Sequence, residues 1–153
     1  GGTNVAWGGA GIVWEHNSGQ SDDRTRFVNP TTVVTVVEED SNDANYELLQ
    51  ENLKRLLTMC DEKNRPLRIV ELPMCGVIEH EGQRLPASYA NFYVANGCVI
   101  VPTFNDVNDR IALHVLAESF PEHAVVGIHA VDLVWGLWPP HCLPQQEPAP
   151  RRR

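Results

Sequence analysis

The stretch Thr31-Thr32-Val33-Val34-Thr35-Val36-Val37 is β-branched at every position and has no polar face. β-Branched side chains favour extended backbone, and a strand without alternation is typical of one that is buried on both faces. We therefore predict a central strand over residues 31–37, with the rest of the domain built on either side of it.

A helix is predicted directly after this strand. Asp40-Ser41-Asn42-Asp43 supplies helix-starting residues, and apolar side chains then recur at helical spacing. The predicted inward positions are Tyr46, Leu49, Leu53, Leu56, Leu57 and Cys60. Pro66 ends this region. Apolar and polar residues alternate over 67–72, which predicts a further strand, and residues 73–84 are predicted to form a polar loop.

The second half of the chain repeats the alternation of strands and helices. Asn96-Gly97 is a strong hairpin signal between predicted strands at 92–94 and 98–101. A helix is predicted from Asn105 to about Phe120, with Ile111, Val115 and Leu116 facing inward, followed by strands at 125–128 and 131–135. Together with a short strand expected at residues 5–7, this pattern predicts an α/β fold in which similar units recur without a clear sequence repeat.

Composition narrows the function classes. The 153 residues are 42% hydrophobic and carry a net charge of −8, which argues against nucleic acid and is compatible with a small cationic substrate. No apolar run reaches the length of a membrane span, so no membrane partner is expected. The four cysteines show no Cys-x-x-Cys pair, so neither a zinc site nor a disulfide framework is predicted. Free thiols fit a reducing compartment, and we expect a cytoplasmic protein.

Cys142 is the candidate for chemistry. It follows the apolar run of residues 131–135, so we predict a thiol at the close of a buried strand, held as a nucleophile on a rigid element. The alternative is that Cys142 is a small buried hydrophobic residue.

Two blocks carry a family resemblance: LPASYANFYVANG at residues 85–97 and HCLPQQ at residues 141–146. The chain resembles the agmatine deiminases, which are grouped with the bacterial-type peptidyl-arginine deiminases, from about residue 4 to residue 148. The resemblance implies a five-bladed α/β propeller, of which this chain would supply the last two to three blades. It also implies an additional N-terminal half, because members of the family carry one that supplies further substrate-binding residues. The opening of the chain, without a methionine and directly into a predicted strand, leads to the same expectation. We expect residues 1–148 to be the C-terminal portion of such a domain and 149–153 to be a short disordered basic tail.

The resemblance also implies site residues. Cys142 matches the nucleophile, which in the family forms a covalent thiouronium without metal or cofactor. Asp22 matches the carboxylate that binds the guanidinium of the substrate. Gln20 stands at the position of the family histidine, and a glutamine cannot carry proton transfers near neutral pH.

Further departures surround the nucleophile. Pro139, Pro140 and Pro144 replace residues of a flexible loop, and proline removes a backbone donor and fixes φ. The adjacent His141 is given a structural role, because neighbouring strand residues point to opposite faces. His16 is an alternative candidate for the base that Gln20 cannot supply. Asn91, Tyr93 and Asn96 are interpreted as turn-forming and sheet-packing residues. The other histidines are expected on the surface or in the core, and Cys60, Cys75 and Cys98 are expected to be packing thiols.

Three functions follow from this. The first is an agmatine deiminase-like hydrolase, which converts agmatine and water to N-carbamoylputrescine and ammonia in putrescine biosynthesis. The second is a peptidyl-arginine deiminase. The third, favoured by Gln20, the three prolines and the truncated start, is a non-catalytic remnant that folds, or pairs with another chain, and binds a guanidinium ligand or nothing. A missing N-terminal half or a second copy of the chain is the partner considered.

Overall fold

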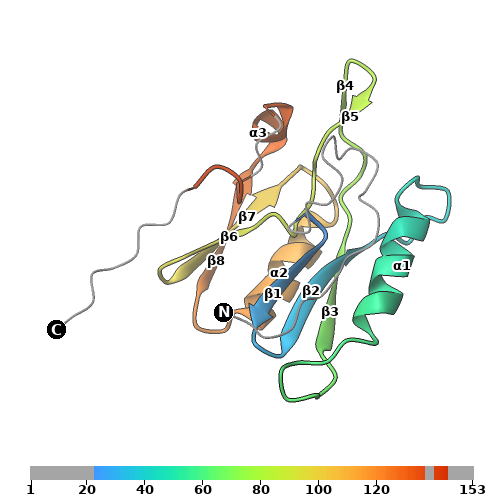
Figure 1. Cartoon of the computed structure of the whole chain (residues 1–153). Helices are drawn as coiled ribbons and strands as arrows, with labels where there is room; N and C mark the ends of the chain where they lie inside the picture. The colour runs from blue at the N-terminus through green and yellow to red at the C-terminus, as the bar shows by residue number, and fades with distance from the viewer. Residues whose placement is uncertain (1–22, 137–139, 145–153) are drawn as a thin grey trace.

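A computed structural model describes residues 23–136 and 140–144. Its first part is a ββαβ unit, coloured blue to green in Figure 1. The unit consists of β1 (Thr25–Asn29), β2 (Thr32–Val37), α1 (Tyr46–Leu56) and β3 (Arg68–Pro73). β1 is antiparallel to β2, and β2 is parallel to β3 after the crossover through α1. All six residues of β2 are buried, which confirms the central strand predicted from its β-branched composition.

The second part has the same topology. It consists of β6 (Tyr93–Ala95), β7 (Cys98–Thr103), α2 (Asp109–Ser119) and β8 (Ala124–His129). β6 and β7 form the predicted hairpin across Asn96-Gly97, where Gly97 adopts a φ of 78° that favours glycine. β7 then pairs in parallel with β8. The recurrence of similar α/β units is thus confirmed within the described residues, while the number of blades in a propeller stays a prediction.

Two elements between and after these units differ from the predictions. Residues 73–84, expected to be a polar loop, contain the hairpin β4 (Glu79–His80) and β5 (Gln83–Arg84). Its turn places Glu81 and Gly82 at φ values of 50° and 77°. The apolar run expected to be a strand forms the short helix α3 (Val131–Trp135), which buries Val134.

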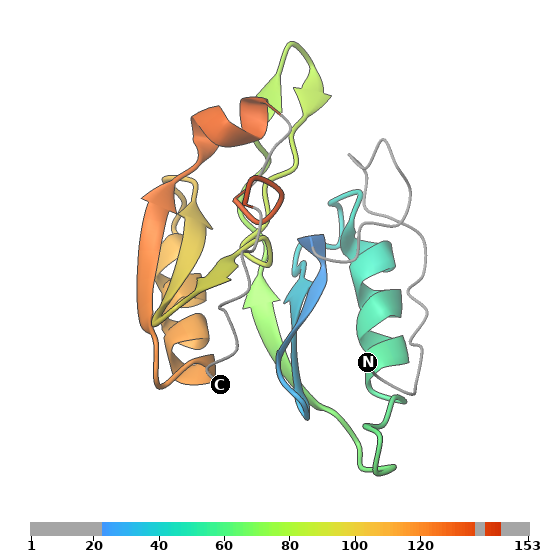
Figure 2. The same ribbon diagram turned by 60° about the vertical axis from the view of Figure 1, so that its left-hand side comes forward.

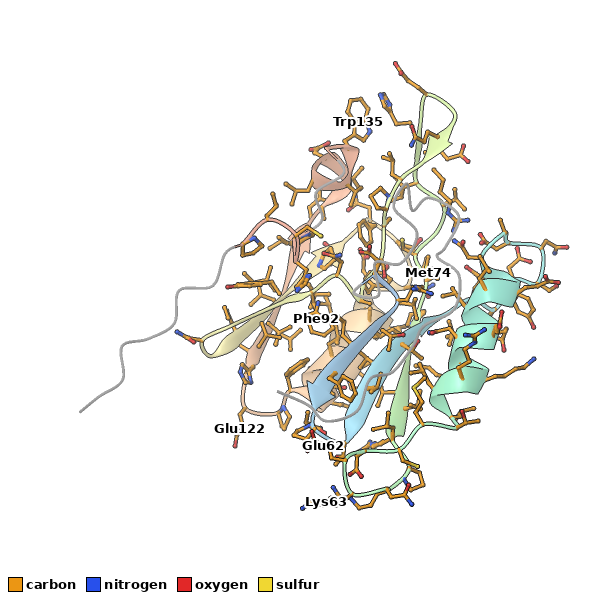
Figure 3. The ribbon with its side chains drawn as sticks, viewed as in Figure 1. Glu62, Lys63, Met74, Phe92, Glu122 and Trp135 are labelled. Atoms are coloured by element: carbon orange, nitrogen blue, oxygen red, sulfur yellow. The ribbon has the colours of Figure 1, made fainter. Side chains whose placement is uncertain are left out.

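The two units stack as layers in the order α1, first sheet, α2, second sheet (Figures 1 and 2). α2 contacts both β3 and β8, so this helix is the layer that joins the two sheets. The core on either side of it is aliphatic and aromatic, and Phe92 lies near the centre of the molecule (Figure 3). Its fully buried members include Val34, Val36, Leu72, Phe92, Val99, Val101 and Leu116.

The helix faces were predicted only in part. Leu49, Leu56 and Leu116 are buried as expected. Leu57 and Ile111 are 64% and 52% exposed, so their predicted inward orientation is wrong. Leu57 follows the last residue of α1, and Cys60 is exposed beyond it. When the helical periodicity is extended beyond the last residue of α1, Leu57 and Cys60 are assigned to the inward face of a helix that has already ended.

Among the described residues, none of the helices is long and apolar enough to cross a membrane.

Candidate functional site

Cys142 lies in a turn that follows α3, rather than at the end of a strand. Pro140, His141 and Cys142 form the described part of this turn, in which Pro140 is buried and Cys142 is half-buried. The prediction of a strand-borne thiol is therefore wrong, and so is the argument that His141 and Cys142 point to opposite faces because they are strand neighbours. The turn must be held in place by contacts with other elements.

Asn91 supplies such a contact. The backbone N–H of His141, one residue before Cys142, donates a hydrogen bond of 2.8 Å to Oδ1 of Asn91. Asn91 is fully buried and lies 50 residues earlier in the chain. The Cys142 turn is thus fastened to a side chain in the core.

Asp23 is held by the segment that contains Asn91, residues 88–91. The amide Nδ2 of Asn91 donates to Oδ1 of Asp23, and the hydroxyl of Ser88 donates to the backbone carbonyl of Asp23 at 2.6 Å. Ser88 Oγ also accepts from the N–H of Ala90 at 3.2 Å. Asp23, Ser88 and Asn91 are each at most 1% exposed. Residues 88–91 therefore hold the start of the described chain by two bonds.

This arrangement brings together two of the segments that the sequence singled out. Asp23 directly follows the segment that contains Gln20 and Asp22, and His141 directly precedes Cys142. Gln20, Asp22 and His16 themselves lie outside the described residues, so their assignments stay predictions. Asn91, interpreted as a turn-forming and packing residue, instead bridges the two segments. Polar Ser88 and Asn91 within the buried run 85–92 are the signal that was missed, because buried polar side chains need specific partners.

Arg26 extends the network along the other side of the turn. Its Nη1 donates to the carbonyl oxygens of Phe92 at 3.0 Å and of Ala90 at 3.4 Å. Its guanidinium also lies 4.7 Å from the ring centroid of Phe92, within the range of a cation–π interaction. The carbonyls on both sides of Asn91 are thereby bound to β1, which fixes the backbone that carries the bridging amide.

The other cysteines are in different environments. Cys75 is buried and its thiol donates to the carbonyl of Ala87 at 3.4 Å. Burial, followed by the negative charge of Asp106, raises the pKa of Cys75 to about 12. Cys75 is therefore the packing thiol that was expected, whereas Cys60 is exposed and that prediction is wrong for it.

Two of the described histidines contact ordinary neighbours. His80 stacks on Trp135 with ring centroids 3.4 Å apart, and His114 lies 3.5 Å from Glu118 along α2. Within residues 23–136 and 140–144, no three histidine, cysteine or acidic side chains gather in a way that could hold a metal ion.

Comparison with known proteins gives a consistent family. The profile of the Porphyromonas-type peptidyl-arginine deiminases matches residues 1–148. A protein of Enterococcus faecalis with a provisional agmatine deiminase name is 36% identical over 94% of the chain. The chain spans 44% of that relative, less than half its length.

Solved structures agree with the sequences. An agmatine deiminase of Enterococcus faecalis, described as catalyzing its reaction, has a TM-score of 0.73 and 34% identity, with 80% of this chain and 38% of that chain covered. A cysteine-to-serine variant of the C. jejuni agmatine deiminase, with substrate bound, has a TM-score of 0.78 and 28% identity over 87% of this chain and 38% of that one. The chain therefore belongs to the family of agmatine deiminases and bacterial-type peptidyl-arginine deiminases, whose members are hydrolases that act on guanidino groups.

Proposed function

We propose that the chain carries the cysteine half of an agmatine deiminase site and that Cys142 is its nucleophile. The observation that supports this most directly is the fastening of the Cys142 turn, through Asn91, to the segment that follows Asp22. A nucleophile needs a fixed position relative to the group that holds its substrate. Agmatine is favoured as the substrate because related proteins of Enterococcus faecalis and C. jejuni are named for it, the second with substrate bound.

In the proposed reaction, the thiolate of Cys142 attacks the central carbon of the guanidinium while Asp22 holds the cation by its nitrogens. The bond to one terminal nitrogen breaks and that nitrogen leaves as ammonia after it takes up a proton. Water then attacks the resulting thiouronium and releases N-carbamoylputrescine and the free thiol. Both the departure of ammonia and the attack of water need proton transfer, and Gln20 at the family histidine position cannot provide it.

Because Gln20 cannot transfer protons, we expect it to slow turnover without preventing substrate binding. We expect the chain to bind a guanidinium and to present a reactive Cys142, but to release ammonia slowly. Since general acid and base help contributes on the order of 10²–10⁴-fold in rate, Gln20→His should recover part of that factor.

The test combines labelling with turnover. The chain is incubated with a haloacetamidine, an alkylating agent with a guanidinium-like head, and the modified cysteines are identified by mass spectrometry. We expect Cys142 to be labelled first, agmatine to slow that labelling, and Gln20→His to raise the rate of ammonia release. Cys142→Ala is the matched control and should lose both signals. Equal labelling of all accessible cysteines, unaffected by agmatine, would contradict the proposal and favour the non-catalytic remnant.

A peptidyl-arginine substrate is the second candidate, and the family profile that matches residues 1–148 favours it. The same labelling assay separates the two, because a peptide with an internal arginine should then protect Cys142 at lower concentration than agmatine does. We further propose that the two ββαβ units are blades of a five-bladed propeller, and that the protein is cytoplasmic, which its free thiols fit.

A further inference from the structure

We propose that Asn91 is a positioning residue that holds the backbone next to Cys142 relative to Asp23, the residue that directly follows Asp22 in the chain. The inference rests on the proposed function, since it concerns how that site is assembled. It does not require Asn91 to touch the substrate.

The bridge uses both halves of one amide. Oδ1 of Asn91 accepts from the N–H of His141, while Nδ2 donates to the carboxylate of Asp23. The two partners lie 50 and 68 residues away in the chain, so no local structure relates them to each other. Among uncharged side chains of this size, only an amide offers a donor and an acceptor on one rigid plane. Asn91 thereby connects the residue before Cys142 to the residue that follows Asp22 in the chain.

The amide itself is held on a rigid support. The N–H of Asn91 donates to the carbonyl of Ser88 at 3.2 Å, and Ser88 bonds the backbone of Asp23. Arg26 binds the carbonyls on either side of Asn91. With Asn91 fully buried, water cannot readily replace either bond of its side chain. A shift of this amide would move the backbone next to Cys142.

A matched control lies in the first unit. Asn52 is also a buried amide, 6% exposed, and its Nδ2 donates to the hydroxyls of Thr25 and Thr35 at 2.9 and 3.0 Å. Those partners hold α1 to its own sheet and do not involve the Cys142 turn. Asn52→Leu therefore removes a comparable amide without touching the bridge.

The test measures amide exchange and protection of Cys142 in the full chain. In Asn91→Leu, we expect the N–H of His141 to exchange with solvent about 5- to 30-fold faster than in the wild type, by NMR, because one buried bond is lost. Agmatine should no longer slow the labelling of Cys142 by a haloacetamidine. In Asn52→Leu, both readouts should stay within about twofold of the wild type, even if its Tm falls as far as that of Asn91→Leu.

Asn91→Asp provides a second variant that keeps the size of the side chain. Two carboxyl groups would then face each other. The charged or titratable residues around them are Arg24, which follows Asp23 in the chain, Arg26, which binds the carbonyls on either side of residue 91, and His141, whose N–H donates to that residue. A shared proton restores one donor and one acceptor, and close carboxylates raise the pKa of the pair. Relative to the wild type at the same pH, His141 exchange should be close to normal near pH 5 and accelerated near pH 9.

The outcomes separate the two proposals. Unchanged His141 exchange in Asn91→Leu, or equal acceleration in Asn52→Leu, would overturn the positioning role. If agmatine fails to protect even the wild type while Asn91→Leu still frees His141, the proposed function fails but the bridge is confirmed. If Asn91→Leu does not fold, the pH dependence of Asn91→Asp decides, and its absence would overturn the proposal.

Discussion

At the scale of single residues, Cys75 and Cys60 show how strongly position decides the behaviour of a thiol. Burial, the larger effect, and the charge of Asp106 raise the pKa of Cys75 from 9.0 to about 12, whereas Cys60 is exposed. In the folded chain at pH 8, we expect iodoacetamide to modify Cys60 and to leave Cys75 unmodified until the chain is unfolded in urea. Early labelling of Cys75 would contradict its burial.

The raised pKa of Cys75 also predicts a pH dependence of stability. Between pH 9 and 12 the unfolded chain loses this proton while the folded chain keeps it. The contribution of Cys75 to the free energy of unfolding is therefore fully present below pH 9 and is lost as the pH rises above it. The loss between pH 9 and 11 should be about 2 kcal/mol, because one pKa unit corresponds to about 1.4 kcal/mol. Cys75→Ala serves as the control, since urea unfolding of this variant should show a shallower decline over the same range.

At the scale of elements, the β4–β5 hairpin is held by an ion pair that sequence patterns do not reveal. Nη1 of Arg84 lies 3.0 Å from both oxygens of Asp43, in the loop before α1, and both side chains are mostly buried. Burial acts to raise the pKa of Asp43, but the hydrogen bond and charge of Arg84, with the N–H of Asn45, lower it overall. The pair thus stabilises the folded chain above the ordinary pKa of 3.8, and this contribution is lost as the pH falls through the lowered folded value.

Asp43→Asn should therefore reduce the free energy of unfolding at pH 7 by about 1.5–3 kcal/mol, because a partly buried charged hydrogen bond is lost. The difference from the wild type should shrink as urea unfolding is repeated at lower pH. Glu51→Gln, which breaks the exposed pair with Arg55 on α1, is the matched control and should cost less than about 0.5 kcal/mol. Equal losses in the two variants would show that burial does not strengthen the Asp43 pair.

The sequence predicted the elements with a long, regular pattern, and also the β6–β7 hairpin, which the Asn96-Gly97 turn signal indicated. Residues 31–37 are β-branched throughout, and α1 and α2 repeat their apolar positions over several turns. The run 131–135 is too short for its pattern to separate a strand from a helix, and α3 forms there. The strands of the 79–84 hairpin are two residues each, which leaves no period to detect. The bridge through Asn91 spans 50 and 68 residues, and only the fold could place its partners side by side.

At the scale of the whole molecule, the layer order makes a prediction about equivalent strands. In the first sheet, Val34 pairs with Val70 on the face that packs toward α2, and Val34 is fully buried. The register of the second sheet places Ile100 and Val126 at the equivalent pair, on the face turned away from α2, where Val126 is 47% exposed. The same strand position is thus covered by a helix in one unit and faces outward in the other.

Val34→Ala should then lower the free energy of unfolding by about 2 kcal/mol, from lost burial and the cavity that remains. Val126→Ala removes the same atoms from a half-exposed site, where less apolar surface is buried, and should cost well under about 1 kcal/mol. Urea unfolding of both variants, at one pH and followed by circular dichroism, provides the comparison. Similar losses would mean that the outer face of the second sheet is packed in solution, and would contradict a stack that ends at β6, β7 and β8 within the described residues.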